Sequence, residues 1–112
     1  MLKGPIYEIV RGQIRLARRA DFFRLHREQL VPMVRAAGIE PVLLLATEIG
    51  PYGKFLDVFR YESLQDYGER TDQFLGDPKI AEYYREVGEC IVGSIEVELA
   101  VEIPQVVAER RR

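Results

Sequence analysis

The chain has few side chains suited to proton transfer, because its 112 residues include one histidine and one cysteine. His26 falls near the middle of the apolar side of a predicted helix. A neutral imidazole there could act as a general base or as a haem ligand near neutral pH. The same position also fits a hydrogen-bonded histidine in the core or at its rim, and the pattern alone leaves both interpretations open.

Asp57 is the second candidate, because it lies between Phe55 and Phe59 on one face of a predicted strand, with Tyr61 beyond. Aromatic surroundings remove water from a carboxyl group, which is one way that proteins tune a general acid or base. Strand parity does not say whether this face meets the helices or a partner molecule. In the second case we expect Asp57 to pair with an arginine across the interface. We predict that His26, Asp57 and Tyr61 carry proton transfers.

Several aromatic side chains could bind a ligand beside these groups. The hydroxyls of Tyr7, Tyr61 and Tyr84 could orient an aromatic or quinone-like molecule, and Phe22 and Phe59 could supply apolar contacts. Tyrosines at strand and helix spacing also serve as core or rim residues with one wet end. The predicted ligand-binding set is Tyr7, Phe22, Phe59 and Tyr84.

Neither a metal site nor a bound cofactor is expected. Glu96, Glu98 and Glu102 share a strand face, but ligands at that spacing spread over about 20 Å. The chain has no cluster of His and Cys, no glycine-rich phosphate loop and no nucleophile elbow. We expect Cys90, inside a predicted helix, to be a small buried apolar residue.

The charges are unevenly distributed, although 16 basic and 18 acidic residues give a net charge of −2. Residues 1–37 hold eight basic and three acidic side chains, whereas residues 38–109 hold five basic and fifteen acidic ones. We therefore expect opposite charges to meet within the subunit or across a dimer. The acidic balance argues against nucleic-acid binding. The longest apolar run, residues 42–46, is far shorter than a membrane span, and we see no signal peptide, so we expect a cytoplasmic protein with no membrane partner.

The hydrophobic periodicity predicts four strands and three helices. A helix over residues 19–37 ends at Gly38 and should bend at Pro32, which cannot donate to the carbonyl of Glu28. Ser63 and Asp66 resemble a capping box for the second helix. The expected strands cover residues 6–14, 39–49, 55–61 and 94–103, and the other helices run from Ser63 to Gly76 and from Asp77-Pro78 to about Ile91.

This order, β-α-β-β-α(α)-β, predicts an α+β fold of the ferredoxin-like kind, with helices on one face of a four-stranded antiparallel sheet. The strand over residues 39–49 has apolar side chains on both of its faces, which indicates that both faces are covered. The simplest cover is the same face of a second copy, so we predict a homodimer with two sheets packed face to face. We expect one domain over residues 1–103 and a C-terminal tail over residues 104–112.

Five short segments together resemble the NIPSNAP family of the dimeric α/β-barrel superfamily. They are Tyr7-Glu8-Ile9, Pro32, Thr47-Glu48-Ile49-Gly50-Pro51, Arg60-Tyr61-Glu62-Ser63-Leu64 and Asp77-Pro78. The resemblance implies two ferredoxin-like subunits that close into one barrel, with a pocket in each subunit between sheet and helices. The chain departs from the family at Asp57 and Phe59, where members often carry His and Trp.

The resemblance implies little about the reaction, because NIPSNAP proteins share no established one. The wider superfamily includes cofactor-independent monooxygenases, haem-degrading enzymes, haem-dependent dismutases and polyketide cyclases, and haem enters only through this analogy. We expect the cleft to bind a small apolar or aromatic molecule, with cofactor-independent oxygenase- or isomerase-type chemistry. The alternative is a non-catalytic homodimeric scaffold or ligand carrier.

Overall fold

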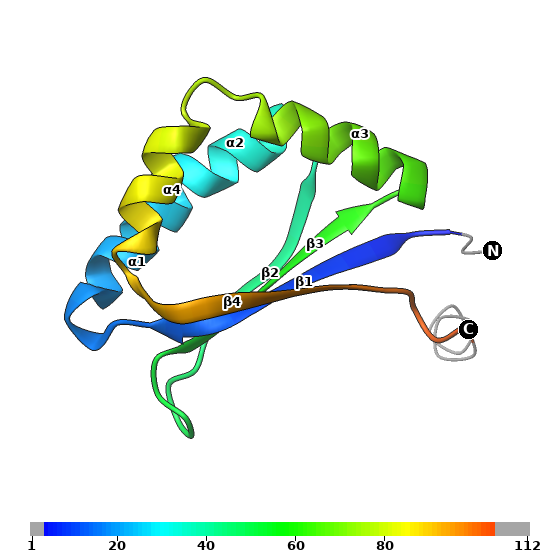
Figure 1. Ribbon diagram of the computed structural model, residues 1–112. Helices are drawn as coiled ribbons and strands as arrows, with labels where there is room; N and C mark the ends of the chain where they lie inside the picture. Colours follow the sequence, from blue (N-terminus) through cyan, green and yellow to red (C-terminus); the bar gives the residue numbers. More distant parts are fainter. Residues whose placement is uncertain (1–3, 105–112) are drawn as a thin grey trace.

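The computed structural model describes residues 4–104, which form one sheet with helices on one of its faces (Figure 1). The expected tail at 104–112 therefore lies outside the described residues, apart from Pro104. The strands are β1 (Ile6–Ile14), β2 (Glu40–Ala46), β3 (Lys54–Tyr61) and β4 (Ile91–Ala100); the helices are η1 (Leu16–Arg18), α1 (Arg19–Leu25), η2 (His26–Leu30), α2 (Val31–Ala36), α3 (Leu64–Leu75) and α4 (Ile80–Gly88). No helix among these is long and apolar enough to cross a membrane.

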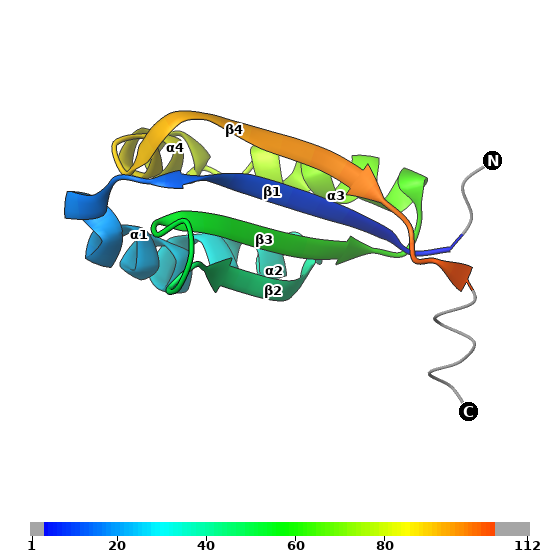
Figure 2. The ribbon, with the colours of Figure 1, turned by 90° about the horizontal axis from the view of Figure 1, so that it is seen from below.

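The four strands form a single antiparallel sheet in the order β2-β3-β1-β4. Figure 2 shows this sheet from its open face, with the helices behind it. The predicted α+β architecture of the ferredoxin-like kind is therefore confirmed for the single chain. The structure shows which face of each strand meets the helices. In β3 the side chains that point toward the helices and are buried are those of Phe55, Asp57, Phe59 and Tyr61.

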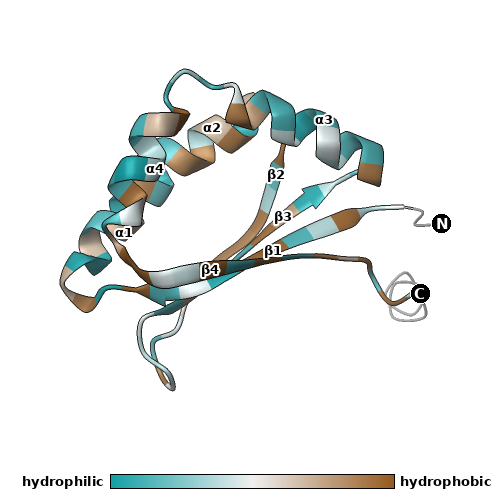
Figure 3. Ribbon diagram, in the orientation of Figure 1, coloured by the Kyte–Doolittle hydropathy of each residue, from teal (hydrophilic) through white to brown (hydrophobic). Residues whose placement is uncertain are grey.

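The core lies between this sheet face and the first helix, which runs continuously through α1, η2 and α2. Phe22, Leu25, Leu30, Met33 and Val34 of that helix are all buried, as the predicted apolar side requires. Gly38 follows the helix with φ +79°, the left-handed conformation that glycine adopts without strain. By contrast, none of the residues of α3 is buried, and its ribbon is largely hydrophilic in colour (Figure 3).

The expected bend at Pro32 takes the form of a π-helical turn. In η2, the N–H of Val31 donates to the carbonyl of His26, five residues earlier. Pro32 follows directly and has no N–H to continue the ordinary pattern. An extra residue in the preceding turn accommodates the proline, and such turns often occur at functional sites.

The helix α3 begins after Ser63 and ends before Gly76, as its capping signals predict, whereas α4 begins at Ile80 instead of Pro78 and ends earlier than expected. The N–H of Asp66 donates to Ser63 Oγ at 3.0 Å. The Asp66 carboxylate accepts from the N–H of Glu62 at 2.9 Å, so the capping box is present with its second bond shifted by one residue from Ser63. However, α4 spans Ile80–Gly88 and Ile91 already belongs to β4, opposite Ile14. Periodicity could not detect this boundary, because an apolar Ile91 fits both the helix and the strand. Cys90 is fully buried, as expected, but lies after the helix instead of inside it.

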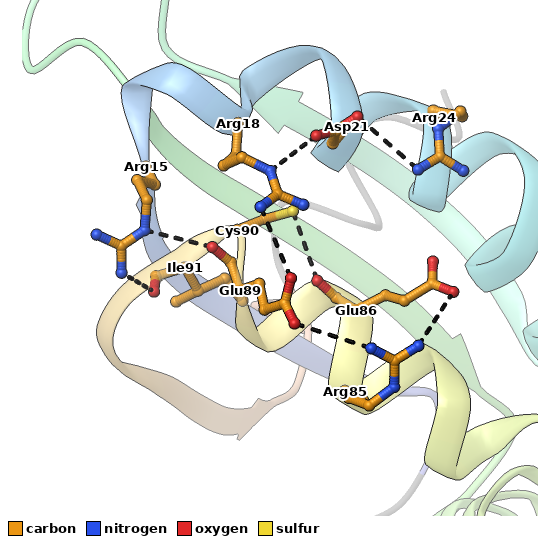
Figure 4. Close-up of polar contacts among 9 residues, drawn as sticks. All are labelled: Arg15, Arg18, Asp21, Arg24, Arg85, Glu86, Glu89, Cys90 and Ile91. Atoms are coloured by element: carbon orange, nitrogen blue, oxygen red, sulfur yellow. Dashed lines mark hydrogen bonds and ion pairs between the residues drawn. The ribbon is translucent and has the colours of Figure 1, made fainter.

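The uneven charges meet within the subunit where η1 and α1 approach the end of α4 (Figure 4). Arg18 donates to Asp21 at 2.7 Å and lies 3.7 Å from Glu89. Arg15 donates from its side chain to the carbonyls of Glu89 and Ile91. Exposed pairs of this kind contribute little individually, about 0 to 1 kcal/mol, but they join the basic N-terminal segment to the residues that follow α4.

Candidate active site

A cavity of about 230 Å³ lies between the helix-facing side of the sheet and the helices. Its walls are mainly aliphatic and aromatic, and its polar groups come from β1, β3 and the helices. The residues that line it are Glu8, Val10, Phe22, His26, Leu30, Val34, Ile39, Phe55, Asp57, Phe59, Tyr61, Thr71, Phe74, Leu75, Tyr83, Tyr84, Val87, Ile91, Ile95 and Val97.

His26 and Asp57 form a hydrogen-bonded pair in the wall of this cavity. His26 Nε2 and Asp57 Oδ2 are 2.8 Å apart, and the two side chains are only 12% and 5% exposed. Strand parity directs Asp57 toward the helices, and the π turn begins at His26. The imidazole also packs against the Phe22 ring, with centroids 4.3 Å apart. Sheet, helix and aromatic packing together fix the pair.

The pairing determines what the imidazole can do. A carboxylate can only accept, so an ionised Asp57 receives the Nε2 proton and leaves the lone pair on Nδ1. His26 Nδ1 is buried and has no hydrogen-bond partner among residues 4–104. A histidine held in this tautomer by a buried carboxylate is the arrangement of a general base, with the acid stabilising the imidazolium that forms.

A second cluster of polar side chains at the cavity surrounds Glu8. The hydroxyls of Tyr61 and Tyr67 donate to its two carboxylate oxygens at 3.0 and 3.5 Å. Burial raises the pKa of Glu8 above its ordinary range, and burial together with the Glu8 charge raises that of Tyr61. Burial, and then the charge of Asp57, raises the pKa of Tyr83. These phenols are therefore neutral hydrogen-bonding groups at physiological pH.

The structure brings most of the predicted residues to one cavity. His26, Asp57, Tyr61, Phe22, Phe59 and Tyr84 all line it. Asp57 faces the helices and pairs with His26, and not with an arginine of a partner. Glu8 and Tyr83 were not predicted. The signal for Glu8 was its position between Ile6 and Val10 on the apolar side of the first strand, where a carboxylate needs partners.

Tyr7 departs from its expected place. It lies opposite Arg60 and Ala100 on the open face of the sheet, and its hydroxyl donates to Glu102 at 2.5 Å. The alternation of β1 that directs Glu8 toward the helices directs its neighbour Tyr7 away from them. Tyr7 therefore does not contribute to this cavity.

The cavity is poorly suited to a metal or to haem. Within residues 4–104 no group of three or more His, Cys, Asp and Glu side chains could hold a metal ion. Glu98 of the acidic strand pairs with Arg11, and Glu102 accepts from Tyr7. Haem ligation through His26 Nε2 does not fit, because that nitrogen is bonded to Asp57.

Similarity to known proteins agrees with this fold. A NIPSNAP protein of Agrobacterium tumefaciens superposes with a TM-score of 0.79 at 21% identity, over 92% of this chain and 90% of that one. A NIPSNAP-like protein of Burkholderia xenovorans gives 0.80 at 19% identity, over 91% and 88%. A Bordetella bronchiseptica protein described as a putative antibiotic biosynthesis monooxygenase gives 0.71 at 23% identity, over 90% and 99%.

These identities establish a shared fold and no shared reaction. Comparison with curated proteins gave no match. The NIPSNAP family model, however, matches residues 7–105, nearly the whole chain. All the residues that line the cavity lie within the matched range. The chain therefore belongs to the NIPSNAP family.

Proposed function

We propose that the cavity binds a small, largely apolar or aromatic molecule and that His26, held by Asp57, removes a proton from it. The observation that carries this proposal is the 2.8 Å contact between His26 Nε2 and Asp57 Oδ2, together with Nδ1, which none of the described residues 4–104 hydrogen-bonds. A site made only of aliphatic and aromatic carbon could bind such a molecule but could not activate it. Paired titratable groups at a shared cavity are the minimum for acid-base catalysis.

The proposed step starts with transfer of a proton from a C–H beside a carbonyl, or from a phenol, to His26 Nδ1. The imidazole becomes an imidazolium, whose charge the Asp57 carboxylate offsets, and the ligand becomes an enolate or phenolate. Tyr61 and Tyr84 supply neutral hydroxyls at the same cavity. Because Nδ1 is buried, the side chains that cover it must shift for the ligand to reach it.

Proton removal is the step that two kinds of cofactor-independent chemistry share. Return of the proton to another carbon would complete an isomerisation, whereas reaction of the anion with molecular oxygen would complete an oxygenation. The fold shared with proteins described as putative antibiotic biosynthesis monooxygenases supports the second outcome. The proposal depends only on the first step.

Solvent deuterium exchange tests that step without knowledge of the final product. A panel of enolisable aryl ketones is incubated with the protein in D₂O, and deuterium at the carbon beside the carbonyl is measured by mass spectrometry. For a compound that binds, we expect His26→Gln to lower the exchange rate by about 10² to 10⁴-fold, the usual contribution of a positioned base. Asp57→Asn should also slow exchange, because an amide cannot stabilise the imidazolium.

Tyr52→Phe is the matched control, since Tyr52 is exposed and does not line the cavity. Binding of the same compound to each variant, measured by equilibrium dialysis, separates loss of catalysis from loss of the fold. Exchange that is equally fast in wild type and His26→Gln would refute the proposal.

The alternative function, a non-catalytic homodimeric scaffold or carrier, has its own support on the open face of the sheet. Ile9, Leu43, Leu45, Leu56 and Val58 alternate with the cavity-facing residues and form an apolar stripe there. Leu43 and Leu45 are 49% and 52% exposed. We propose that this stripe is the homodimer face, with or without catalysis. A ligand that binds while exchange does not depend on His26 would favour the carrier.

A further inference from the structure

A second hollow lies on the other side of the His26–Asp57 pair. It is a groove of about 630 Å³ between the first helix and β2, and His26 and Asp57 belong to its lining as well as to that of the cavity. The pair is thus a partition that both hollows share. The other residues that line the groove are Phe22, Phe23, Arg27, Val31, Arg35, Leu44, Leu45, Ala46 and Glu48.

The π turn explains why two arginines reach this groove. In a regular α-helix with 3.6 residues per turn, each residue lies slightly further around the helix axis than the residue four positions before it. The π turn of η2 has more residues per turn, so this displacement around the axis is smaller there. Arg27, Val31 and Arg35 therefore stay on one side of the helix, and all three line the groove.

Arg27 and Arg35 have no close ion-pair partner among the described residues, so their guanidinium groups can bind a ligand. Arg35 has no ion-pair partner within residues 4–104, and the closest carboxylate recorded for Arg27 is that of Glu28, at 3.9 Å. The groove's own Glu48 pairs with Arg19. Asp57 is bonded to His26. The groove thus combines two exposed, weakly paired guanidinium groups with an apolar wall from α1 and β2.

We propose that this groove binds a small carboxylate that has an apolar or aromatic body. Guanidinium groups bind carboxylates through paired, charge-assisted hydrogen bonds, and the body would lie along Phe22, Phe23 and Leu44. Binding here does not depend on the function proposed for the cavity, because it requires no proton transfer. It does place the ligand next to the wall that contains His26.

An NMR titration with 3-phenylpropanoate, and with its neutral amide 3-phenylpropanamide, tests the inference. We expect the carboxylate to shift the amide signals of Val31, Leu44 and Ala46 and the His26 ring signals. We expect the amide to bind about tenfold more weakly, since one charge-assisted contact contributes roughly that much. Arg27→Gln with Arg35→Gln should remove the preference for the carboxylate, and higher salt should weaken it in wild type.

Arg24→Gln is the matched control, because Arg24 lies on the same helix but lines neither hollow and faces Asp21 and Glu28. All three arginines are on the surface, so the variants should fold. Equal affinity for both compounds would overturn the inference. So would shifts confined to Thr71 and Phe74, which line only the cavity.

The double variant Arg27→Gln with Arg35→Gln separates this inference from the proposed function. We expect it to lose the carboxylate preference while it keeps deuterium exchange, because neither arginine lines the cavity. Exchange that depends on His26 in a protein with no carboxylate preference would leave the proposed function intact and refute the groove.

Discussion

His26 and Asp57 come from positions 31 residues apart in the chain, and the fold joins them at the edge of two hollows. The face of each residue could be predicted, His26 from the helical period and Asp57 from strand parity. Their contact could not, because parity leaves undecided which side of the sheet faces the helices.

Glu8 gives the cavity a measurable pH dependence. Burial raises its pKa above the ordinary value of 4.5, so the folded protein holds a proton on Glu8 over a pH range in which the unfolded chain has lost it. The free energy of unfolding should then fall as the pH rises from 4.5 to the raised pKa. Glu8→Gln, which has no such proton to lose, should gain stability relative to wild type across that window.

Urea unfolding between about pH 4 and pH 7 measures this difference. Glu96→Gln, which replaces an exposed carboxylate of β4, is the control and should follow the wild type. If the stability difference between Glu8→Gln and wild type does not change with pH, the carboxyl group is not in the environment described.

At the scale of elements, the sequence predicts what local chemistry determines. The capping box at Ser63, the helix end at Gly38 and the disturbance at Pro32 follow from single residues with strong backbone preferences. The end of α4 does not, because Ile91 fits both helix and strand. A π turn is equally hard to predict, since a proline inside a helix is compatible with several kinds of bend.

The cap at Ser63 should matter more than usual, because α3 covers one side of the cavity without a buried residue of its own. Ser63→Ala removes the acceptor for the Asp66 N–H, and we expect the free energy of unfolding to fall by about 1 kcal/mol. Amide hydrogen exchange in α3 should accelerate as well. Chemical denaturation and exchange measured by NMR check both effects.

Ser94→Ala is the matched control, because Ser94 is an exposed strand residue that caps no helix. If Ser63→Ala leaves both the stability and the exchange in α3 unchanged, the capping box does not hold the helix.

The two faces of the sheet differ in the features that they carry. The helix side contains the cavity and the groove, and the open side of the sheet carries the apolar stripe. In the single chain Leu43 and Leu45 of β2 are exposed, so the cover expected over both faces of residues 39–49 stays a prediction. The segregation of charge is explained within one subunit by the contacts of Arg11, Arg18 and Arg19 with Glu98, Glu89 and Glu48.

If the stripe is the homodimer face, placing charge on it should separate the subunits. We expect light scattering after size-exclusion chromatography to give twice the 12.9 kDa chain mass for wild type. Leu43→Glu with Leu45→Glu should give the mass of one chain, because burying two carboxylates in an apolar interface is costly. Leu64→Glu, on an exposed position of α3, should remain dimeric. A wild-type monomer at micromolar concentration would contradict the predicted dimer.

The central claim, that His26 is poised to accept a proton at Nδ1, has a direct test. The sequence contains one histidine, so the imidazole nitrogens give a single pair of ¹⁵N resonances in the untagged protein. In the neutral imidazole we predict the tautomer with the proton on Nε2 and the lone pair on Nδ1, and loss of this preference in Asp57→Asn. A neutral ring with its proton on Nδ1 in the wild type would contradict the account, because the free nitrogen would then face Asp57 and could not serve as the base.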